Sequence, residues 1–355
     1  MNTLKHLISQ LCSNFSIHSA RKETISAILF GMMTLGNVQH QSFARFLNTA
    51  KPHNAIRRIE RFFAQVSLSC AESALTMVKL LGFKGKFQLC LDRTNWKFGV
   101  KNINYLVLSW RLNKKVSLPL FAMELDKAGN SNTAERIEIL EMFEKTFGME
   151  RIEFLLADRE FVGDKWLRKL VVWKVPFYIR IKDNILVPYG DDPIHIKALF
   201  NHLKPNEYRI IEKEMHGTTL YYAGTRSSQG DLVVVVSNQD VRAQKILDNY
   251  RKRWSIEEMF RKMKSSGFNW ENTHMTNSSR LMTLFILMSL ATLLAYCMGI
   301  NTKIPWKKTI NYPLRSLFRE GLINFQHHAA KGLETAWRFI LNSLTEARKI
   351  LKLCY

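Results

Sequence analysis

The sequence predicts an α/β fold: a mixed sheet flanked by helices, with a β-rich insertion and helical N- and C-terminal regions. Three observations support this prediction. Between residues 87 and 181, apolar runs of strand and helix length follow in the order β-β-β-α-β-α-β. The residues before this stretch are apolar at helical spacing, and a basic helical tail ends the chain. Short strand-like runs separated by glycines lie between these two parts.

Residues 1–84 are predicted to be a helical, DNA-binding N-terminal region. Pro52 opens a helix that carries an apolar stripe and, beside it, a basic stripe. The basic stripe contains Arg57, Arg58 and Arg61. Two short helices joined around residues 49–52 would suit a helix-turn-helix that binds DNA. The alternative is a plain helical bundle with a basic surface.

Residues 85–182 are predicted to be the first part of a catalytic core. The expected strands cover residues 87–91, 105–112, 118–125, 152–157 and 176–181, and the expected helices cover 132–147 and 164–173. The first strand should end on Asp92, and the fourth on Asp158. Acidic residues at strand ends meet at one edge of a sheet, so these two carboxylates are expected to lie close together.

The rest of the chain divides into three predicted regions: a β-rich insertion (183–230), a second core part (231–301) and a basic helical C-terminal region (302–355). The second core part contains a buried strand over 232–237. It also contains an uncharged stretch, 281–300, that is long enough to span a membrane. Polar residues within this stretch, such as Thr283 and Ser289, and the lack of a second span favour a buried core helix and no membrane partner.

Charge and cysteine content indicate the kind of binding partner and exclude some classes of protein. The 355 residues contain 52 Lys+Arg and 30 Asp+Glu, a net charge of +22, which indicates a polyanionic partner: nucleic acid first, an acidic membrane surface second. The five cysteines form no CxxC pair, which argues against a zinc ribbon or a disulfide scaffold. They suit reduced thiols in a cytoplasmic protein.

Residues 250–264 are predicted to form one charged helix. At about 100° per residue, Tyr250, Arg253, Glu257 and Lys264 fall within about 60° of one another around the helix axis. Arg261 lies beside them. This row places one carboxylate among three groups that can bind phosphate. A solvated surface helix would scatter its charges instead. A mixed-charge helix stabilised by neighbouring ion pairs is the alternative.

Asp92, Asp158 and Glu257 together predict a metal site. Clustered carboxylates repel one another unless cations neutralise them. Oxygen ligands favour Mg²⁺, with Mn²⁺ possible, and two such ions can activate a nucleophile and stabilise the leaving oxygen of a phosphodiester. Two further acids, Glu160 and Glu258, compete for this role, and Glu257 is preferred because Glu258 points about 100° away from it.

These segments also carry a resemblance to a known family. The spacing Y-x2-R-x3-E-x6-K from Tyr250 to Lys264 resembles the Y-R-E-K signature of bacterial DDE transposases related to insertion sequence four. Asp92-Arg93-Thr94-Asn95-Trp96 and Asp158-Arg159-Glu160-Phe161 are similar to that family's segments around its first two catalytic aspartates.

The resemblance, which covers roughly residues 86–267, implies a ribonuclease-H-like core and a cut-and-paste DNA transposase. Asp92, Asp158 and Glu257 would be the metal-binding triad, and Tyr250, Arg253 and Lys264 would contact the transposon end. The implied partners are inverted-repeat ends, target DNA and a second copy of the chain in a synaptic complex. Some members flip a base onto an aromatic ring. Tyr221, Tyr222 and Trp270 are open candidates for that ring.

Two other functions stay open at this stage. One is a metal-dependent nuclease, or a domesticated copy without strand transfer. The other is a non-catalytic DNA-binding inhibitor of transposition in which the acidic residues are structural.

Overall fold

A computed structural model describes residues 2–114, 116–215, 217–300, 302, 304, 306–307 and 312–353. In these residues, eight strands form one sheet in the order β3-β2-β1-β4-β5-β10-β9-β8. The strands are β1 (Phe87–Phe98), β2 (Lys101–Arg111), β3 (Ser117–Glu124), β4 (Ile152–Ala157), β5 (Phe177–Ile181), β8 (Tyr208–Met215), β9 (Thr218–Arg226) and β10 (Leu232–Ser237). Strands β1, β4 and β5 run parallel, and the other neighbours pair antiparallel. The predicted ribonuclease-H-like mixed sheet is confirmed.

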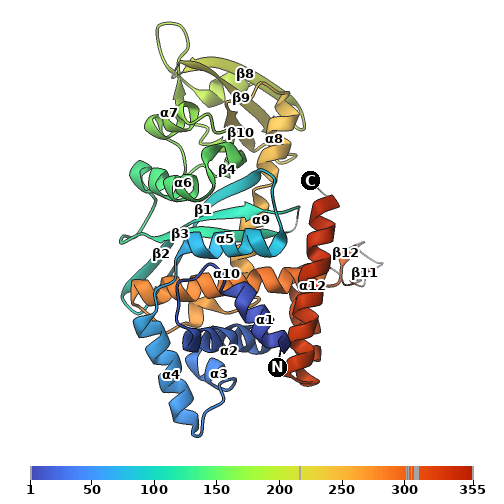
Figure 1. The fold of residues 1–355 in the computed structure, drawn as a ribbon. Helices are drawn as coiled ribbons and strands as arrows, with labels where there is room; N and C mark the ends of the chain where they lie inside the picture. Colours follow the sequence, from blue (N-terminus) through green and yellow to red (C-terminus); the bar gives the residue numbers. More distant parts are fainter. Residues whose placement is uncertain are drawn as a thin grey trace.

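Helices cover both faces of this sheet (Figure 1). On one face, α6 (Thr133–Phe147) packs its Phe143 ring 5.3 Å from the ring of Phe87 in β1. Asn132 caps α6, because its side-chain oxygen accepts a hydrogen bond from Glu135 N and the Glu135 carboxylate accepts one from Asn132 N. On the other face lie α8 (Ala243–Arg251) and α9 (Trp254–Lys264). The helix α7 (Asp164–Val172) packs beside α6.

The uncharged stretch forms most of α10 (Ser278–Ile300), which is long and apolar enough to cross a membrane, yet 94% of its apolar window is buried in the protein. Helices from both ends of the chain pack around it (Figure 1). Those that contact it are α2 (Ser19–Leu35), α4 (Pro52–Gln65), α5 (Cys70–Leu81), α11 (Leu317–Ala330) and α12 (Leu333–Leu353). Two more, α1 (Asn2–Leu11) and α3 (His40–Ala44), pack on these helices. The burial agrees with the predicted core helix. The two terminal regions therefore share one core, and their predicted boundaries stay predictions.

Two predicted element boundaries near the candidate site residues are wrong. The first strand continues through Asp92 to Phe98, because its antiparallel partner β2 keeps pairing as far as Lys101. The single helix over 250–264 is two helices, α8 and α9. Between them, Arg253 N bonds to Tyr250 O and Ile256 N to Arg253 O, the i→i+3 spacing of a tighter turn.

The predicted β-rich insertion contains four strands and the 3₁₀ turn Ile196–Phe200. The pair β6 (Leu186–Val187) and β7 (Ile194–His195) stands apart from the main sheet, whereas β8 and β9 extend it beyond β10. In the C-terminal region, β11 (Trp306–Lys307) pairs with β12 (Tyr312–Pro313). Cys12, Cys70, Cys90 and Cys297 are free and buried, and Cys354 lies outside the described residues.

Two glycines allow α10 and α11 to pack backbone against backbone. A Cβ on Gly299 would lie 1.9 Å from Leu317 O, and one on Gly321 would lie 1.8 Å from Ala295 O. Gly321→Ala should therefore force the helices apart and lower the free energy of unfolding by about 1–3 kcal/mol, the usual cost of overpacking. Urea denaturation measures this change. His327→Ala, an exposed site on α11, is the control and should change it by less than about 0.5 kcal/mol.

Candidate active site

The acid site is defined here as Asp92, Asp158 and Glu257. Leu91 in β1 pairs with Ala157, the last residue of the parallel strand β4. The residues that follow this pair are Asp92 and Asp158. Both carboxylates therefore lie where the parallel pairing between β1 and β4 stops. Glu257 lies in the first turn of α9, which packs against β1. The expectation that the two aspartates lie close at one edge therefore holds locally, although β1 itself continues.

Arg253 and Tyr250 connect these acids. Arg253 donates from Nη1 to Asp92 Oδ2 at 3.0 Å and from Nη2 to Glu257 Oε1. Tyr250 donates its hydroxyl to Asp158 Oδ1 at 3.1 Å. The Arg253 guanidinium also lies 5.8 Å from the centre of the Tyr250 ring, and Arg253 is only 8% exposed. Residues from β1, the end of β4, α8 and α9 thus meet in one buried network.

The charges of this network shift several pKa values. Burial raises the pKa of Asp92 from its ordinary value of 3.8 to about 6; the charges of Asp158 and Glu160 add to the rise, while Arg253 and the Arg93 N–H oppose it. Burial would lower the pKa of Arg253, but the neighbouring Tyr250 and carboxylates outweigh burial and raise it. Arg253 is therefore a permanent internal cation among the acids.

The Asp92 shift has a consequence for stability. Because its pKa is raised on folding, the folded protein binds more protons than the unfolded chain between pH 3.8 and about 6. This group therefore stabilises the fold most below pH 3.8, and its contribution falls as the pH rises to about 6. The difference in unfolding free energy between wild type and Asp92→Asn should change across this window and stay constant above it. Urea titrations of metal-free protein from pH 4.5 to 7.5 measure it, and a difference that does not vary with pH would contradict the shift.

The two competing acids have other partners. Glu160 accepts two bonds from the Arg93 guanidinium, at 2.9 and 3.3 Å. Glu258 pairs with Arg261 at 2.7 Å and with Lys262 at 3.5 Å. The preference for Glu257 agrees with this geometry. Sequence reasoning missed Arg93, although an arginine directly after Asp92 and an acid two residues after Asp158 were visible signals of a cross-strand pair.

The predicted basic residues are only partly brought together. Lys264 lies along the same face of β1 as Asp92: its Nζ donates to Asn95 O at 3.0 Å, pairs with Glu271 at 2.5 Å and lies 5.6 Å from the Trp96 ring centre. Arg261 is exposed, and its contact is with Glu258 rather than with the acid site.

Arg57, Arg58 and Arg61 lie on α4, beyond α10 from the sheet (Figure 1). Arg57 and Arg61 are exposed, and Arg58 pairs with Glu23 at 2.7 Å. The basic stripe therefore exists as predicted, but it is not part of the acid site.

The three candidate aromatic residues differ in how exposed their rings are. Trp270 is fully buried, 4.6 Å from Trp96 between ring centres, and Tyr222 is 3% exposed, so both rings serve the core. Tyr221 is half-buried. Sequence reasoning missed Trp254, which is 63% exposed directly after Arg253. A tryptophan on an otherwise charged helix was the signal for it.

The acid site fits a divalent cation in its ligand chemistry. It offers carboxylate oxygens, the ligands that Mg²⁺ and Mn²⁺ prefer. In the described part of the chain, no group of three His, Cys, Asp or Glu side chains is already arranged around a metal position. Instead, the Arg253 guanidinium supplies the positive charge between Asp92 and Glu257.

Comparison with known proteins gives one family match. Residues 113–294 match the family model described as "Transposase DDE domain". The matched segment includes Asp158 and Glu257, and Asp92 lies before it. No curated protein matches this sequence.

Two solved structures show weak similarity. One is the cryo-EM structure of a piggyBac transposase synaptic complex with hairpin DNA: 10% identity, covering 99% of this chain and 80% of that chain, with a TM-score of 0.48. The other is the NurA nuclease from Sulfolobus solfataricus: 12% identity, covering 57% and 82%, with a TM-score of 0.27. At these scores, neither structure is a guide to the chemistry of this chain.

Proposed function

Because the transposase DDE domain model matches just over half of its length, this chain belongs to the DDE transposase family, and we propose that it performs cut-and-paste transposition. In this proposal it cleaves DNA at the inverted-repeat ends of a mobile element and joins the ends to target DNA. Two copies of the chain would hold the two ends in a synaptic complex, in the cytoplasm of a bacterium and away from any membrane.

One observation carries the proposal: the buried network through which Arg253 and Tyr250 connect three acids that are far apart in the sequence. Asp92 and Glu257 share the Arg253 guanidinium, and Asp158 accepts from Tyr250. A structural salt bridge would need one acid for one base. Here three carboxylates lie around one cation, Arg253, and the pKa of Asp92 is raised. This arrangement instead suits a site that binds further positive charge.

In the proposed reaction, Asp92, Asp158 and Glu257 would hold two Mg²⁺ or Mn²⁺ ions. When bound, such ions would supply Lewis-acid activation of the attacking water or 3′-hydroxyl and stabilisation of the leaving oxygen. Arg253 neutralises the acids before DNA arrives and binds a phosphate of the end afterwards. Tyr250 hydrogen-bonds a neighbouring phosphate, and Lys264, at the far end of α9, holds the backbone further along.

Within the family, we assign the chain to the group related to insertion sequence four. The Y-R-E-K spacing supports this assignment, because three of its four residues, Tyr250, Arg253 and Glu257, meet in one network. They do so although the helix is interrupted between them.

The test is an in vitro reaction with DNA that carries the inverted repeats flanking the gene, supercoiled target plasmid and Mg²⁺. A transposase should release the end and join it to the plasmid, which gel electrophoresis and sequencing of the junctions detect. Cleavage without joining would indicate the nuclease or domesticated copy. Binding without cleavage would indicate the non-catalytic inhibitor and refute the proposal.

The ring of Trp254, the residue after Arg253, is 63% exposed, and we propose that it stacks on an unpaired base at the cut end. Base–aromatic stacking contributes about 1–3 kcal/mol by alanine substitution. Trp254→Ala should therefore weaken binding of end DNA with a single-stranded overhang by at least about fivefold. Trp254→Phe should retain most of the affinity. Fluorescence anisotropy measures both, and equal affinities for wild type and Trp254→Ala would remove Trp254 from the DNA contact.

A further inference from the structure

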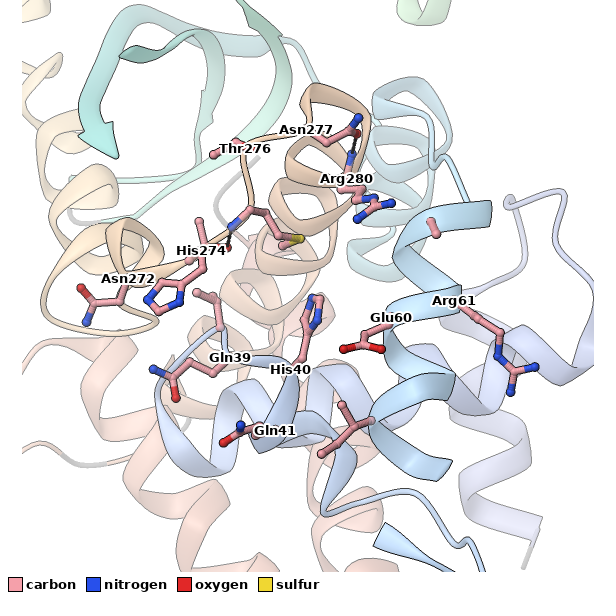
Figure 2. A pocket seen from close by; sticks show the side chains of 15 residues that line it. Gln39, His40, Gln41, Glu60, Arg61, Asn272, His274, Thr276, Asn277 and Arg280 are labelled. Carbon is pink, nitrogen blue, oxygen red and sulfur yellow. Dashed lines mark hydrogen bonds between the residues drawn. The ribbon is translucent and has the colours of Figure 1, made fainter. Parts of the chain in front are cut away.

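A polar groove lies away from the acid site, between the N-terminal helices and the chain that leads into α10. Its volume is about 810 Å³. One wall comes from the start of α3 and from α4, and the other from residues 272–280 (Figure 2). We call it the amide groove, after the side chains of Gln39, Gln41, Asn272 and Asn277, which line it together with Arg61 and Arg280.

The groove offers unused hydrogen-bonding groups. Gln39 and Gln41 are exposed on one wall, and Asn272 is exposed on the other. Within the described residues, no hydrogen bond is recorded for these three side-chain amides. Asn277 differs, because its Oδ1 accepts from Arg280 N at the start of α10. The side-chain amides of Gln39, Gln41 and Asn272 and the guanidinium groups of Arg61 and Arg280 therefore line the groove and can bind a ligand.

The groove connects to the acid site along one face of β1. Side chains alternate between the two faces of a strand, so Asp92, Thr94, Trp96 and Phe98 point the same way. Trp96 lies under Lys264, and the ring of Phe98 stacks on His274 in the groove wall, with 5.5 Å between centres. Six residues of strand at about 3.3 Å each place this wall about 20 Å from Asp92.

A second hollow continues the groove along α4. It has a volume of about 470 Å³ and is lined by Arg21, Arg58 and Arg61, among others. Arg61 lines both hollows. Basic groups therefore follow one another away from the groove, in the arrangement that a phosphate backbone requires.

The side chains of the groove point to recognition of bases in double-stranded DNA. Amides of Gln and Asn bind adenine in pairs of hydrogen bonds, and Arg binds guanine in the same way. The groove also contains an acid: Glu60 lines it from α4, and Figure 2 shows Glu60 directed toward His40 between the walls.

We propose that the amide groove reads bases of the element's own end, about six base pairs from the cleaved phosphodiester. This proposal rests on the proposed function and makes it more specific. The position follows from the 20 Å span along β1 and the rise of about 3.4 Å per base pair. The acid site cuts, Lys264 holds the intervening backbone, and the groove decides which DNA is held.

The experiment uses a library of 30-base-pair duplexes with random sequence, from which the full-length protein selects its preferred DNA. The groove variant combines Gln39→Ala with Arg280→Gln. Its matched control combines Gln229→Ala with Arg319→Gln, two exposed sites elsewhere that remove the same groups and the same charge. Asn277 is left unchanged because it caps α10.

Wild type and the control variant should enrich fixed bases at adjacent positions, and the groove variant should lose about tenfold of that enrichment at one or two of them. Total binding at low salt should match that of the control. Cleavage of the selected duplex by wild type should fall about six base pairs from these positions, and a footprint of the wild-type protein should protect them.

Equal enrichment by the groove variant and its control would overturn the proposal, and so would a footprint that leaves these positions unprotected. In both cases cleavage by the wild type would leave the proposed function standing. If the wild type selects and cleaves no DNA at all, the proposed function itself fails and the groove proposal fails with it.

Discussion

Asp92→Asn is expected to reduce cleavage of end DNA by on the order of 1,000-fold, which corresponds to about 4 kcal/mol of lost transition-state stabilisation. Asparagine has the shape of aspartate, and its Oδ1 can still accept from Arg253. What it loses is the negative charge that a hard divalent cation needs. Single-turnover cleavage in Mg²⁺ measures the rate, and binding of the uncut end should stay within about threefold, because the DNA backbone is held by other residues.

The control for this prediction is Asp126→Asn, which makes the same chemical change at an exposed position. Its cleavage rate should equal that of wild type. Glu257→Gln should lose activity to a similar extent as Asp92→Asn. The double variant should be little worse than either single one, because residues that act as a unit are not additive. Cleavage by Asp92→Asn at the rate of the Asp126→Asn control would remove Asp92 from the catalytic residues.

Most of the sheet could be predicted from the sequence, because buried strands leave strong local patterns. The run over 232–237 is a strand with the predicted bounds, and so is the run over 152–157. The helix α6 was predictable from its apolar period and from Asn132, which caps it. These elements are determined by their own residues and by burial.

The limits of β1 and α9 were not predictable because distant residues set them. Residues 93–98 are polar at several positions and resemble a loop, but β2 supplies hydrogen bonds that keep them extended. The break at Lys252 and Arg253 depends on two i→i+3 bonds in a stretch with no Gly or Pro. The angles predicted for Tyr250, Arg253, Glu257 and Lys264 assumed one continuous helix, whereas the backbone forms two helices. Tyr250, Arg253 and Glu257 nevertheless lie together. Tyr250 bonds to Asp158 and Arg253 bonds to Asp92, and Glu257 accepts from the same Arg253 guanidinium.

Partners across the fold also determine where the candidate residues lie. Arg261 shares a helix face with Glu257 by angle alone, yet Glu258 is the acid within its reach. Trp270 looked like an available aromatic, but Trp96, Tyr105 and Phe285 enclose it. Which polar residue faces a partner and which faces water depends on contacts that no local pattern contains.

Arg253→Ala is expected to lower the free energy of unfolding of the metal-free protein by about 3–5 kcal/mol, the usual cost of removing one partner of a buried ion pair. The guanidinium is buried and serves Asp92 and Glu257 together, so its loss leaves two carboxylates without their cation. Mn²⁺ should stabilise this variant more than it stabilises wild type, because the ion takes over the charge that Arg253 supplied. Thermal unfolding with and without Mn²⁺ measures both effects.

The matched control is Arg261→Ala, which removes an arginine from the same helix. Its partner Glu258 lies at i,i+3 spacing, and the Arg261 side chain is 60% exposed, so water replaces the ion pair at a cost of less than about 1 kcal/mol. Both variants lose one guanidinium and one pair to a glutamate of α9, but only Arg253→Ala also loses a buried pair to Asp92. If Arg253→Ala were as stable as Arg261→Ala, or if Mn²⁺ stabilised it no more than wild type, Arg253 would not be the internal cation of the acid site. Because Arg253 supplies the positive charge between Asp92 and Glu257, we propose that a cation replaces it there when the metal binds, which would release Arg253 toward the DNA.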